Sequence, residues 1–410
     1  MAASSHALLR IGEHEDIYYS DPANTKIQAI PVEYNTRYQQ DLANKGAGTS
    51  VFLIPPGNGL RHIVIVLGYA PLAGQNNALN RGWGYNAIKN VSFRIAGSSQ
   101  YYLSGAQLLA RNMRLCRTKS QRDSILQLGG AEVKTVGEFA SAQYAYIPVS
   151  VFAAPSSDGI GLPLPLDASS QQVQITVELN PPTAFWVPNT VAPAALPSQF
   201  DYAYFQVEQL TMEDKGMSIA NRVDLNTHSY NMPLPDFDQQ EFALPLQSSA
   251  SSQPVVLSGF RAGQVKRLMC WLTKGTDAVV NPNKWYKPKA VTALYAGVIY
   301  SQYNDGSSAI WNLLDGTAPA AVEYSSLAQV GGGGFTSTAT LNEWVELPFA
   351  QPTDGRDYTG EMLVNGKEIT NGIVNLQITT PTAAADWTLH VVYVYNCTAS
   401  FSKGSCELVF

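Results

Sequence analysis

Charged side chains are scarce in this 410-residue sequence. Lys and Arg number 26 and Asp and Glu 32, so charged residues make up 14% of the chain, against about 25% in an average soluble protein. The net charge of −6 argues against a protein that holds duplex DNA or RNA through its phosphates, and we expect no sequence-specific nucleic acid among its partners. A subunit that buries much of its surface against copies of itself would need few charges.

Cysteines and long hydrophobic runs are also few. The four cysteines form no CxxC pair, so neither a zinc finger nor a disulfide scaffold is indicated, and folding in a reducing, intracellular place is favoured. The short apolar stretch at 7–9 is followed by acidic residues, which is not the form of a secretory signal. The strongest apolar run, residues 63–70, is far shorter than the roughly 20 residues that a membrane helix needs, so we expect a buried strand. The cysteines are Cys116, Cys270, Cys397 and Cys406.

Recognisable catalytic motifs are absent from the sequence. It contains no HExxH, EF-hand loop or Walker-type loop, and we therefore expect no catalytic residue, no cofactor and no metal site. The acidic cluster at 13–16 is interpreted as a solvated arm, because adjacent ligands on one short segment rarely converge on a cation. His62 and His390 fall on predicted strands and are interpreted as hydrogen-bonded or half-exposed side chains. Four glycines at 331–334 lack the Lys-Ser/Thr of a phosphate loop, so a flexible loop tip is expected.

Two further patterns suggest carbohydrate chemistry only weakly. The glycosylation sequons at Asn90 and Asn396 lie in or beside predicted strands, and we attribute both to chance. No motif points to the pair of carboxylates that glycoside hydrolysis requires. Several large aromatics could stack on sugars, but a place in the core or at an interface is favoured. These aromatics are Trp285, Tyr286, Trp311 and Trp344.

Most apolar segments alternate with period two, which indicates half-buried strands. Turn pairs such as Asp-Gly separate them. The chain is therefore predicted to be mainly β. The predicted strands cover residues 89–97, 172–180, 204–210, 255–257, 265–272, 293–300, 344–347, 373–378 and 389–395.

One section departs from this pattern and predicts helix. Ser104-Gly105-Ala106-Gln107 has the form of a capping box, and apolar residues recur after it at helical spacing. A second short helical turn is expected over 122–128, where two glycines follow.

The two halves of the chain share a weak duplication. Residues 89–95 and 266–272 both begin with Lys and then place apolar residues at alternate positions. Each half also ends with a period-two strand, a proline-containing connection and an aromatic strand. We predict two copies of one β domain with a boundary near 213–216, which gives an arm at 1–30, a first domain at 31–214 and a second at 215–410.

Four segments together resemble the double jelly-roll major capsid proteins of icosahedral double-stranded DNA viruses, of the nucleocytoplasmic large DNA virus and virophage-like lineage. Their order and spacing carry the resemblance, since alternating apolar residues occur in every sandwich. The segments are a strand that ends in a Gly turn (83–97), a helical insertion (101–123), an apolar strand with a Leu-Pro-Leu turn and a second strand (146–152, 161–166 and 173–179), and the C-terminal strand (389–410).

The resemblance implies an all-β fold of two consecutive eight-stranded jelly-roll sandwiches, with a short helical insertion in the first. It also implies a structural protein of the virion that is not an enzyme. Its homotrimers would be pseudo-hexagonal capsomers that tile the shell beside penton and minor capsid proteins, with an inner membrane layer as a further partner. Such a protein would be folded and assembled inside the host cell.

Some alternatives stay open from the residues alone. A carbohydrate-binding or host-attachment β-sandwich would use exposed aromatics, and a glycoside-active enzyme would need a carboxylate pair in a groove. Residues 1–30 are expected to form an arm that contacts neighbours or an inner layer. The proline-dense residues 181–198 are expected to line either an outer tower or a subunit contact.

Overall fold

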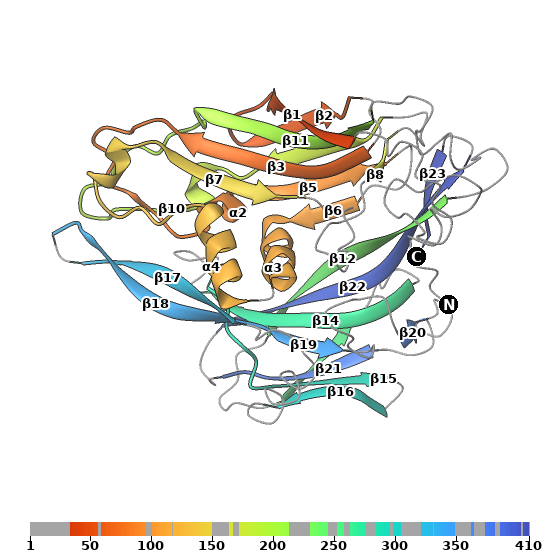
Figure 1. The fold of residues 1–410 in the computed structure, drawn as a ribbon. Helices are drawn as coiled ribbons and strands as arrows, with labels where there is room; N and C mark the ends of the chain where they lie inside the picture. The colour runs from red at the N-terminus through yellow and green to blue at the C-terminus, as the bar shows by residue number, and fades with distance from the viewer. Residues whose placement is uncertain are drawn as a thin grey trace.

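Four main β-sheets, arranged as two pairs, make up most of the molecule (Figure 1). One pair is built from strands that precede residue 213, which we call the first lobe, and the other from strands that follow residue 229, which we call the second lobe. The arm predicted over 1–30, the boundary near 213–216 and Trp311 lie outside the described residues. The computed structural model describes residues 33–55, 59–95, 101–116, 118–149, 164–166, 172–212, 230–244, 252–257, 263–275, 284–295, 298–304, 321–330, 332–348, 362–364, 374–381, 386–402 and 405–409.

The strands of the first lobe alternate between its two sheets, as in a jelly roll. The larger sheet has the order β1-β11-β3-β7 with β8 beside β3, and the other has the order β2-β9-β5-β6. Every pairing is antiparallel. The strands are β1 (Glu33–Asp41), β2 (Gly48–Leu53), β3 (Gly59–Tyr69), β4 (Ala78–Leu79), β5 (Ile88–Arg94), β6 (Tyr101–Ser104), β7 (Gln143–Pro148), β8 (Leu164–Pro165), β9 (Gln174–Leu179), β10 (Trp186–Val187) and β11 (Tyr202–Met212).

The second lobe repeats this order. Its larger sheet runs β12-β22-β14-β19, and β20 also pairs with β14 while β23 pairs with β22. Its other sheet runs β13-β21-β15-β16. The strands are β12 (Tyr230–Leu244), β13 (Ser252–Leu257), β14 (Gly263–Lys274), β15 (Ala290–Tyr295), β16 (Val298–Asn304), β17 (Ala321–Gln329), β18 (Phe335–Glu343), β19 (Val345–Pro348), β20 (Met362–Val364), β21 (Val374–Thr379), β22 (Trp387–Ser402) and β23 (Ser405–Val409).

Both lobes carry an insertion at the same point, between the edge strand of the smaller sheet and the edge of the larger one. In the first lobe it contains two helices, and in the second lobe it is the β17–β18 hairpin. Among the described residues, no helix is long and apolar enough to cross a membrane. The helical elements are α2 (Trp83–Ala87), α3 (Gly105–Leu115), α4 (Lys119–Leu128), η1 (Glu138–Ala140) and η2 (Pro182–Ala184).

Local sequence explains where the two insertion helices begin. The predicted capping box is confirmed, because Ser104 accepts from the backbone of Gln107 while the Gln107 side chain accepts from the backbone of Ser104. Thr118 and Gln121 form a second capping box at the start of α4, which is longer than the turn expected over 122–128. Gly105 allows close packing at this point, since a Cβ there would lie 1.9 Å from the Tyr85 carbonyl oxygen.

The core follows from the alternation of side chains along the strands. In β3, Ile63, Ile65, Leu67 and Tyr69 are at most 1% exposed and point into the first lobe, which confirms the buried strand predicted over 63–70. The second lobe has a hydrophobic cluster of its own. Five second-lobe side chains join the first cluster instead and link the lobes: Met269, Trp271, Trp285, Trp344 and Val392.

The predicted duplication is correct in its later strands and wrong in its first pair. The strands near the ends of the two halves are equivalent, β9 with β21 and β11 with β22. Residues 89–95 and 266–272 are not, because the first belongs to β5 in a smaller sheet and the second to β14 in a larger sheet. Two strands of similar apolar pattern are indistinguishable before their partners are known. The single strand predicted over 293–300 is also wrong, since β15 and β16 pair there as a hairpin.

Candidate assembly surfaces

The outer face of the second lobe's larger sheet is covered by the first lobe. Along β14, Leu268, Cys270 and Leu272 face the core of the second lobe, while Met269 and Trp271 join the cluster of the first. Helices α3 and α4 lie between this sheet and the strands of the first lobe (Figure 1). The strand is therefore buried on both faces.

Aromatic rings dominate this covered face. The Trp271 and Trp285 rings stack with centroids 4.6 Å apart, and the Trp344 ring meets Trp285 edge-on at 6.3 Å. The His390 ring also stacks on Trp271, with centroids 5.4 Å apart, and its Nε2 lies 2.8 Å from the Thr273 hydroxyl. The interpretation of Trp285 and Trp344 as core or interface residues is confirmed, since each is 2% exposed. Their position leaves no face open for a sugar.

One buried cation from α4 lies at this contact. The Arg122 guanidinium lies 5.8 Å from the centroid of the Trp344 ring and donates to the carbonyl oxygens of Met113 and Cys116. Burial lowers the pKa of Arg122, although the nearby Cys116, Glu346 and Asp123 oppose that effect. A buried guanidinium that is hydrogen-bonded and stacked ties α3, α4 and the second lobe together.

A second contact between the lobes lies at the tip of the β17–β18 hairpin. The Asn189 amide donates to the Gly333 carbonyl at 2.8 Å, and Gln329 donates to the Asn189 side-chain oxygen at 2.8 Å. Gly332 and Gly333 have φ of 93° and 84°, a conformation that suits glycine. The loop tip expected at 331–334 forms, over its described residues, a turn with hydrogen bonds to the other lobe. Residues 181–198, expected at a tower or a subunit contact, contact the other lobe of the same chain here.

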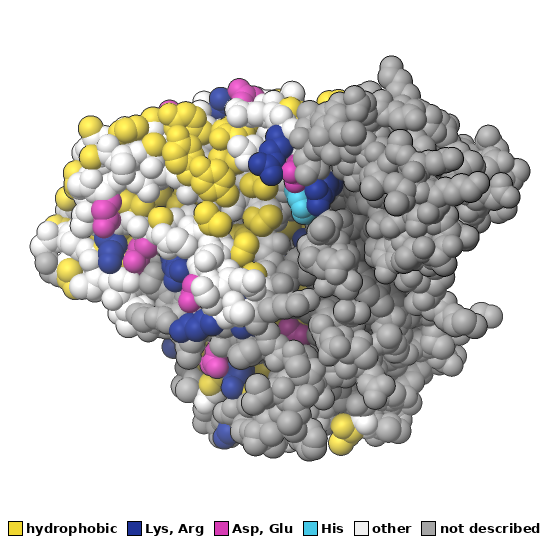
Figure 2. Space-filling view, in the orientation of Figure 1, with side chains coloured by type: hydrophobic (Ala, Val, Ile, Leu, Met, Phe, Trp, Pro, Cys, Tyr) yellow, Lys and Arg dark blue, Asp and Glu magenta, His cyan; other side chains and the backbone are white. Residues whose placement is uncertain are grey.

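The outer face of the first lobe's larger sheet carries an exposed aromatic surface. Tyr144 and Tyr146 of β7 and Tyr202 and Tyr204 of β11 flank the central strand β3, where Tyr202 and Tyr144 pair with Gly68 and Tyr204 and Tyr146 pair with Val66. We call these four tyrosines the tyrosine patch. Figure 2 shows hydrophobic side chains gathered over this part of the first lobe.

The tyrosine patch is ordered by ring contacts and remains open to solvent. Tyr144 lies 5.2 Å from Tyr202 and 6.1 Å from Tyr146 between ring centroids, and Tyr146 and Tyr202 are 37% and 36% exposed. Desolvation raises the pKa of Tyr144, and its hydrogen bond with Tyr202 raises it further. A Cβ at Gly68 would lie 2.8 Å from the Tyr144 ring, so glycine allows that ring to lie over β3.

Charged groups border the patch along the same sheet. Arg37 of β1 pairs with Glu208 of β11 at 3.1 Å, and His62 of β3 lies 3.9 Å from the same carboxylate. Desolvation is the main cause that lowers the pKa of His62, and Glu208 partly opposes it. Figure 2 shows basic, acidic and histidine side chains close together at one end of the hydrophobic area. The surface therefore has an aromatic centre and a charged border, as protein interfaces do.

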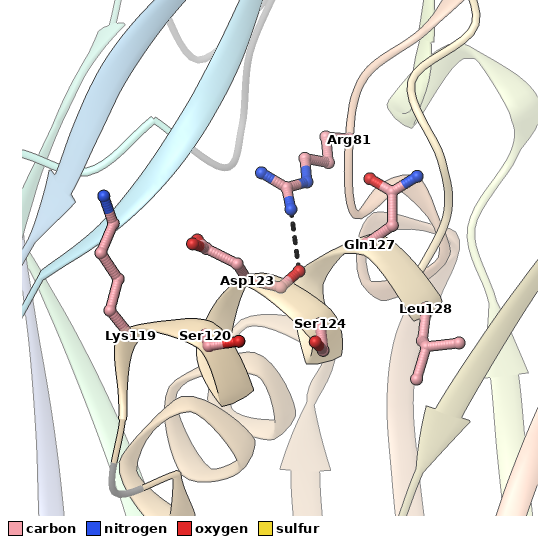
Figure 3. Close-up of a pocket in the computed structure, with 7 residues that line it drawn as sticks. All are labelled: Arg81, Lys119, Ser120, Asp123, Ser124, Gln127 and Leu128. Atoms are coloured by element: carbon pink, nitrogen blue, oxygen red, sulfur yellow. Dashed lines mark hydrogen bonds between the residues drawn. The ribbon is translucent and has the colours of Figure 1, made fainter.

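A cavity of about 740 Å³ runs along α4 (Figure 3). Six of its lining residues come from α4, and Arg81 reaches towards that helix, donating to the Asp123 carbonyl at 2.8 Å. Its lining contains one carboxylate, where glycoside hydrolysis needs two. The lining residues are Arg81, Lys119, Ser120, Asp123, Ser124, Gln127 and Leu128.

The residues singled out for chemistry are dispersed. Within the described part of the chain, no three His, Cys, Asp or Glu side chains converge on a metal position. Cys116 and Cys270 are buried free thiols, and burial raises the pKa of both. The Asn90 amide donates to Glu178 within a sheet, while residues 13–16 lie outside the described residues.

Comparison with known proteins places the fold. No family model and no curated protein sequence matches the chain. Among solved structures, it is similar to VP54 of PBCV-1, fitted into a reconstruction of the virophage Sputnik, with TM-score 0.67, 13% identity, and coverage of 94% of this chain and 98% of that one. The Faustovirus major capsid protein matches with TM-score 0.60, 9% identity, and coverage of 94% and 93%.

A third solved structure gives the same result. The mavirus major capsid protein matches with TM-score 0.52, 12% identity, and coverage of 96% of this chain and 94% of that one. The predicted fold class is therefore confirmed: the chain has the double jelly-roll fold of these viral proteins, over nearly its whole length.

Proposed function

We propose that this chain is the major capsid protein of an icosahedral double-stranded DNA virus, and that three copies form a pseudo-hexagonal capsomer that tiles the shell. The observation that carries the proposal is the pairing of two jelly rolls in one chain, in the fold of solved major capsid proteins. A structural role of this kind needs no active site, so the chain is proposed not to be an enzyme.

The geometry of the lobes favours a ring. The lobes share a strand order, and one side of the first lobe covers the larger sheet of the second. When such a side-to-face contact repeats in one direction, it generates a closed ring if the rotation fits. Three chains with two lobes each give six lobes, which is the outline of a hexagon.

The wider assembly follows as part of the proposal. Capsomers would contact one another in the virion, together with penton and minor capsid proteins and an inner membrane layer. The division into an arm at 1–30, a first jelly roll at 31–214 and a second at 215–410 is kept as part of it, with the arm contacting neighbours or that inner layer. Folding and capsomer assembly would take place inside the host cell. The low charge of the chain suits the extensive contacts between subunits that such an assembly needs.

The native mass of the purified protein tests the proposal. One chain has a mass of 44.4 kDa, so three copies give about 133 kDa. We expect light scattering to give that mass, and negative-stain images of the same fraction to show a six-lobed outline. A stable monomer that binds glycans would contradict the proposal and favour the attachment-protein alternative.

A further inference from the structure

The contact between the lobes joins two different surfaces, so the same kind of contact could form again with another copy of the chain. The first lobe uses the side where its insertion emerges, between β6 and β7, and the second lobe offers the outer face of its larger sheet. Edge strand β6 of the first lobe also lies against β12 of the second. Each lobe thus has a covering side, which is the edge where its insertion emerges, and a face to be covered, which is the outer face of its larger sheet. The contact within the chain joins the covering side of the first lobe to this face of the second.

Among the described residues, one covering side and one covered face have no contact with the other lobe. The unused face is the outer face of the β1-β11-β3-β7 sheet, which carries the tyrosine patch. The unused side is the edge of the second lobe where β16 and β19 meet. Strand β16 is the counterpart of β6, because each is the last strand in the order of its smaller sheet.

We propose that the tyrosine patch binds the β16–β19 edge of the second lobe of another copy of this chain, and that this contact closes the ring. The inference rests on the proposed function and names the surface that it uses. The contact joins different surfaces of two copies, so its repetition in one direction produces a ring when the rotation closes, and not a symmetric dimer.

The two covered faces carry matching chemistry at equivalent places. In the second lobe, β14 contributes Trp271 and β22 contributes His390 on the outer face, near the end of β14 and the start of β22. In the first lobe, Val66 pairs with Tyr204 and Tyr146 near the end of β3 and the start of β11. An aromatic group thus occupies the same place on both sheets, covered in one lobe and exposed in the other.

The proposed partner edge also carries an uncovered apolar side chain. Ile299 of β16 is 56% exposed, on a strand whose outer edge has no neighbour among the described strands. Open strand edges with apolar side chains invite pairing and are usually protected. A tyrosine surface beside an exposed isoleucine supplies the aromatic and aliphatic contacts that occupy the centres of protein interfaces.

Paired substitutions test the two surfaces. Tyr146→Glu in the patch and Ile299→Asp on β16 should each abolish the 133 kDa species and leave folded monomers of 44.4 kDa. Val51→Glu and Val256→Asp are the matched controls, because these side chains are 55% and 49% exposed but lie outside the two surfaces and outside the contact between the lobes. Both controls should stay trimeric. Far-ultraviolet circular dichroism checks that every variant is folded.

Cross-linking identifies the occupant without any charge change. A benzophenone amino acid at position 146, irradiated in a mixture of ¹⁴N- and ¹⁵N-labelled chains, should form links between copies that map to second-lobe peptides. The same group at position 51, on the exposed side of β2, should not form them. Links from position 146 to first-lobe peptides, or no link between copies, would overturn the inference.

The outcomes separate this inference from the proposed function. If the unmodified protein is not trimeric, the proposed function fails before any variant is made. If it is trimeric and both Tyr146→Glu and Ile299→Asp remain trimeric, the proposed function stands and the assignment of these surfaces is wrong.

Discussion

The outer faces of the two larger sheets occupy equivalent positions in their lobes, but one is covered by the other lobe and one is exposed to solvent. The second presents Trp271, Met269 and Val392, and the first lobe covers all three. The first presents tyrosines that remain about one-third exposed at Tyr146 and Tyr202. A phenol has an apolar body and a polar tip, so it tolerates water before a partner arrives. The outer face of the second lobe is therefore buried when the chain folds, whereas that of the first lobe is suited to burial when copies of the chain assemble.

Truncation of the covered face should give the largest effect on stability. Trp271→Ala removes a fully buried ring that stacks on two other rings, and it should lower the free energy of unfolding by about 3–5 kcal/mol. Tyr146→Ala on the exposed face should cost about 1 kcal/mol or less. Urea unfolding at a concentration where both variants are monomeric measures the difference. Equal losses would break the distinction between the two faces.

The buried cation that helps to cover the second face gives the next largest effect. Arg122→Ala removes the group over the Trp344 ring and leaves the carbonyls of Met113 and Cys116 without that donor. The expected loss is about 2–3 kcal/mol in the free energy of unfolding. Arg37→Ala, whose side chain is 81% exposed in its ion pair with Glu208, is the control and should cost under about 1 kcal/mol.

Sequence patterns predict the helices and strands that carry both faces, but they do not predict which strands pair with one another in the sheets. The capping box at Ser104 involves contacts within four residues, so it was accessible from sequence. Tyr144, Tyr146, Tyr202 and Tyr204 alternate visibly along two strands, but β3 lies between them in the sheet and is far from both in sequence. Their meeting depends on strand register, which one sequence does not reveal.

The wrong predictions have the same physical origin. Residues 89–95 and 266–272 share an alternating pattern, although the first segment belongs to a smaller sheet and the second to a larger one. The sequence does not indicate the β15–β16 hairpin, because Ala296-Gly297, between its strands, carries no Asn-Gly or Asp-Gly signal. The β17–β18 turn also forms hydrogen bonds with Asn189, which lies in the other lobe and far away in sequence.

A single added methyl group at the start of α3 should test how tightly the helices that cover the second lobe are packed. Gly105→Ala places a Cβ 1.9 Å from the Tyr85 carbonyl and 2.6 Å from the Ile88 carbonyl, and both are backbone atoms that cannot turn aside. We expect a loss of about 1–3 kcal/mol in the free energy of unfolding, because α3 must shift. Gly137→Ala, whose nearest neighbour is 4.0 Å away, should change it by about 0.5 kcal/mol or less. Similar losses for both would show that α3 tolerates the shift.

Loss of the contact between Asn189 and the β17–β18 hairpin should reduce stability less than crowding at the start of α3. Asn189→Ala removes the donor to the Gly333 carbonyl and the acceptor for Gln329, at a cost of about 1–2 kcal/mol. It also removes hydrogen bonds of this side chain with Asn76, Val191 and Ala192 in its own lobe, so the hairpin is best followed directly. Hydrogen exchange should rise in β17 and β18 and stay unchanged in β14, since the lobes remain joined through α4. Unchanged exchange in the hairpin would show that this side chain does not hold it.

The smallest effect is a pH dependence at the border of the exposed face. Desolvation lowers the pKa of His62 below its usual value of 6.5, so unfolding allows the ring to take up a proton more readily. The unfolded state therefore binds more protons between the lowered pKa and 6.5, and stability must fall as the pH decreases through that window. His62→Gln removes this contribution, so the variant should lose less stability than the original protein between pH 7 and pH 5. Thermal unfolding across that range measures the difference, and an unchanged slope would mean that Glu208 offsets the desolvation. A capsomer that buries this border against another copy would desolvate His62 further, so the slope should be steeper for the trimer than for the Tyr146→Glu monomer.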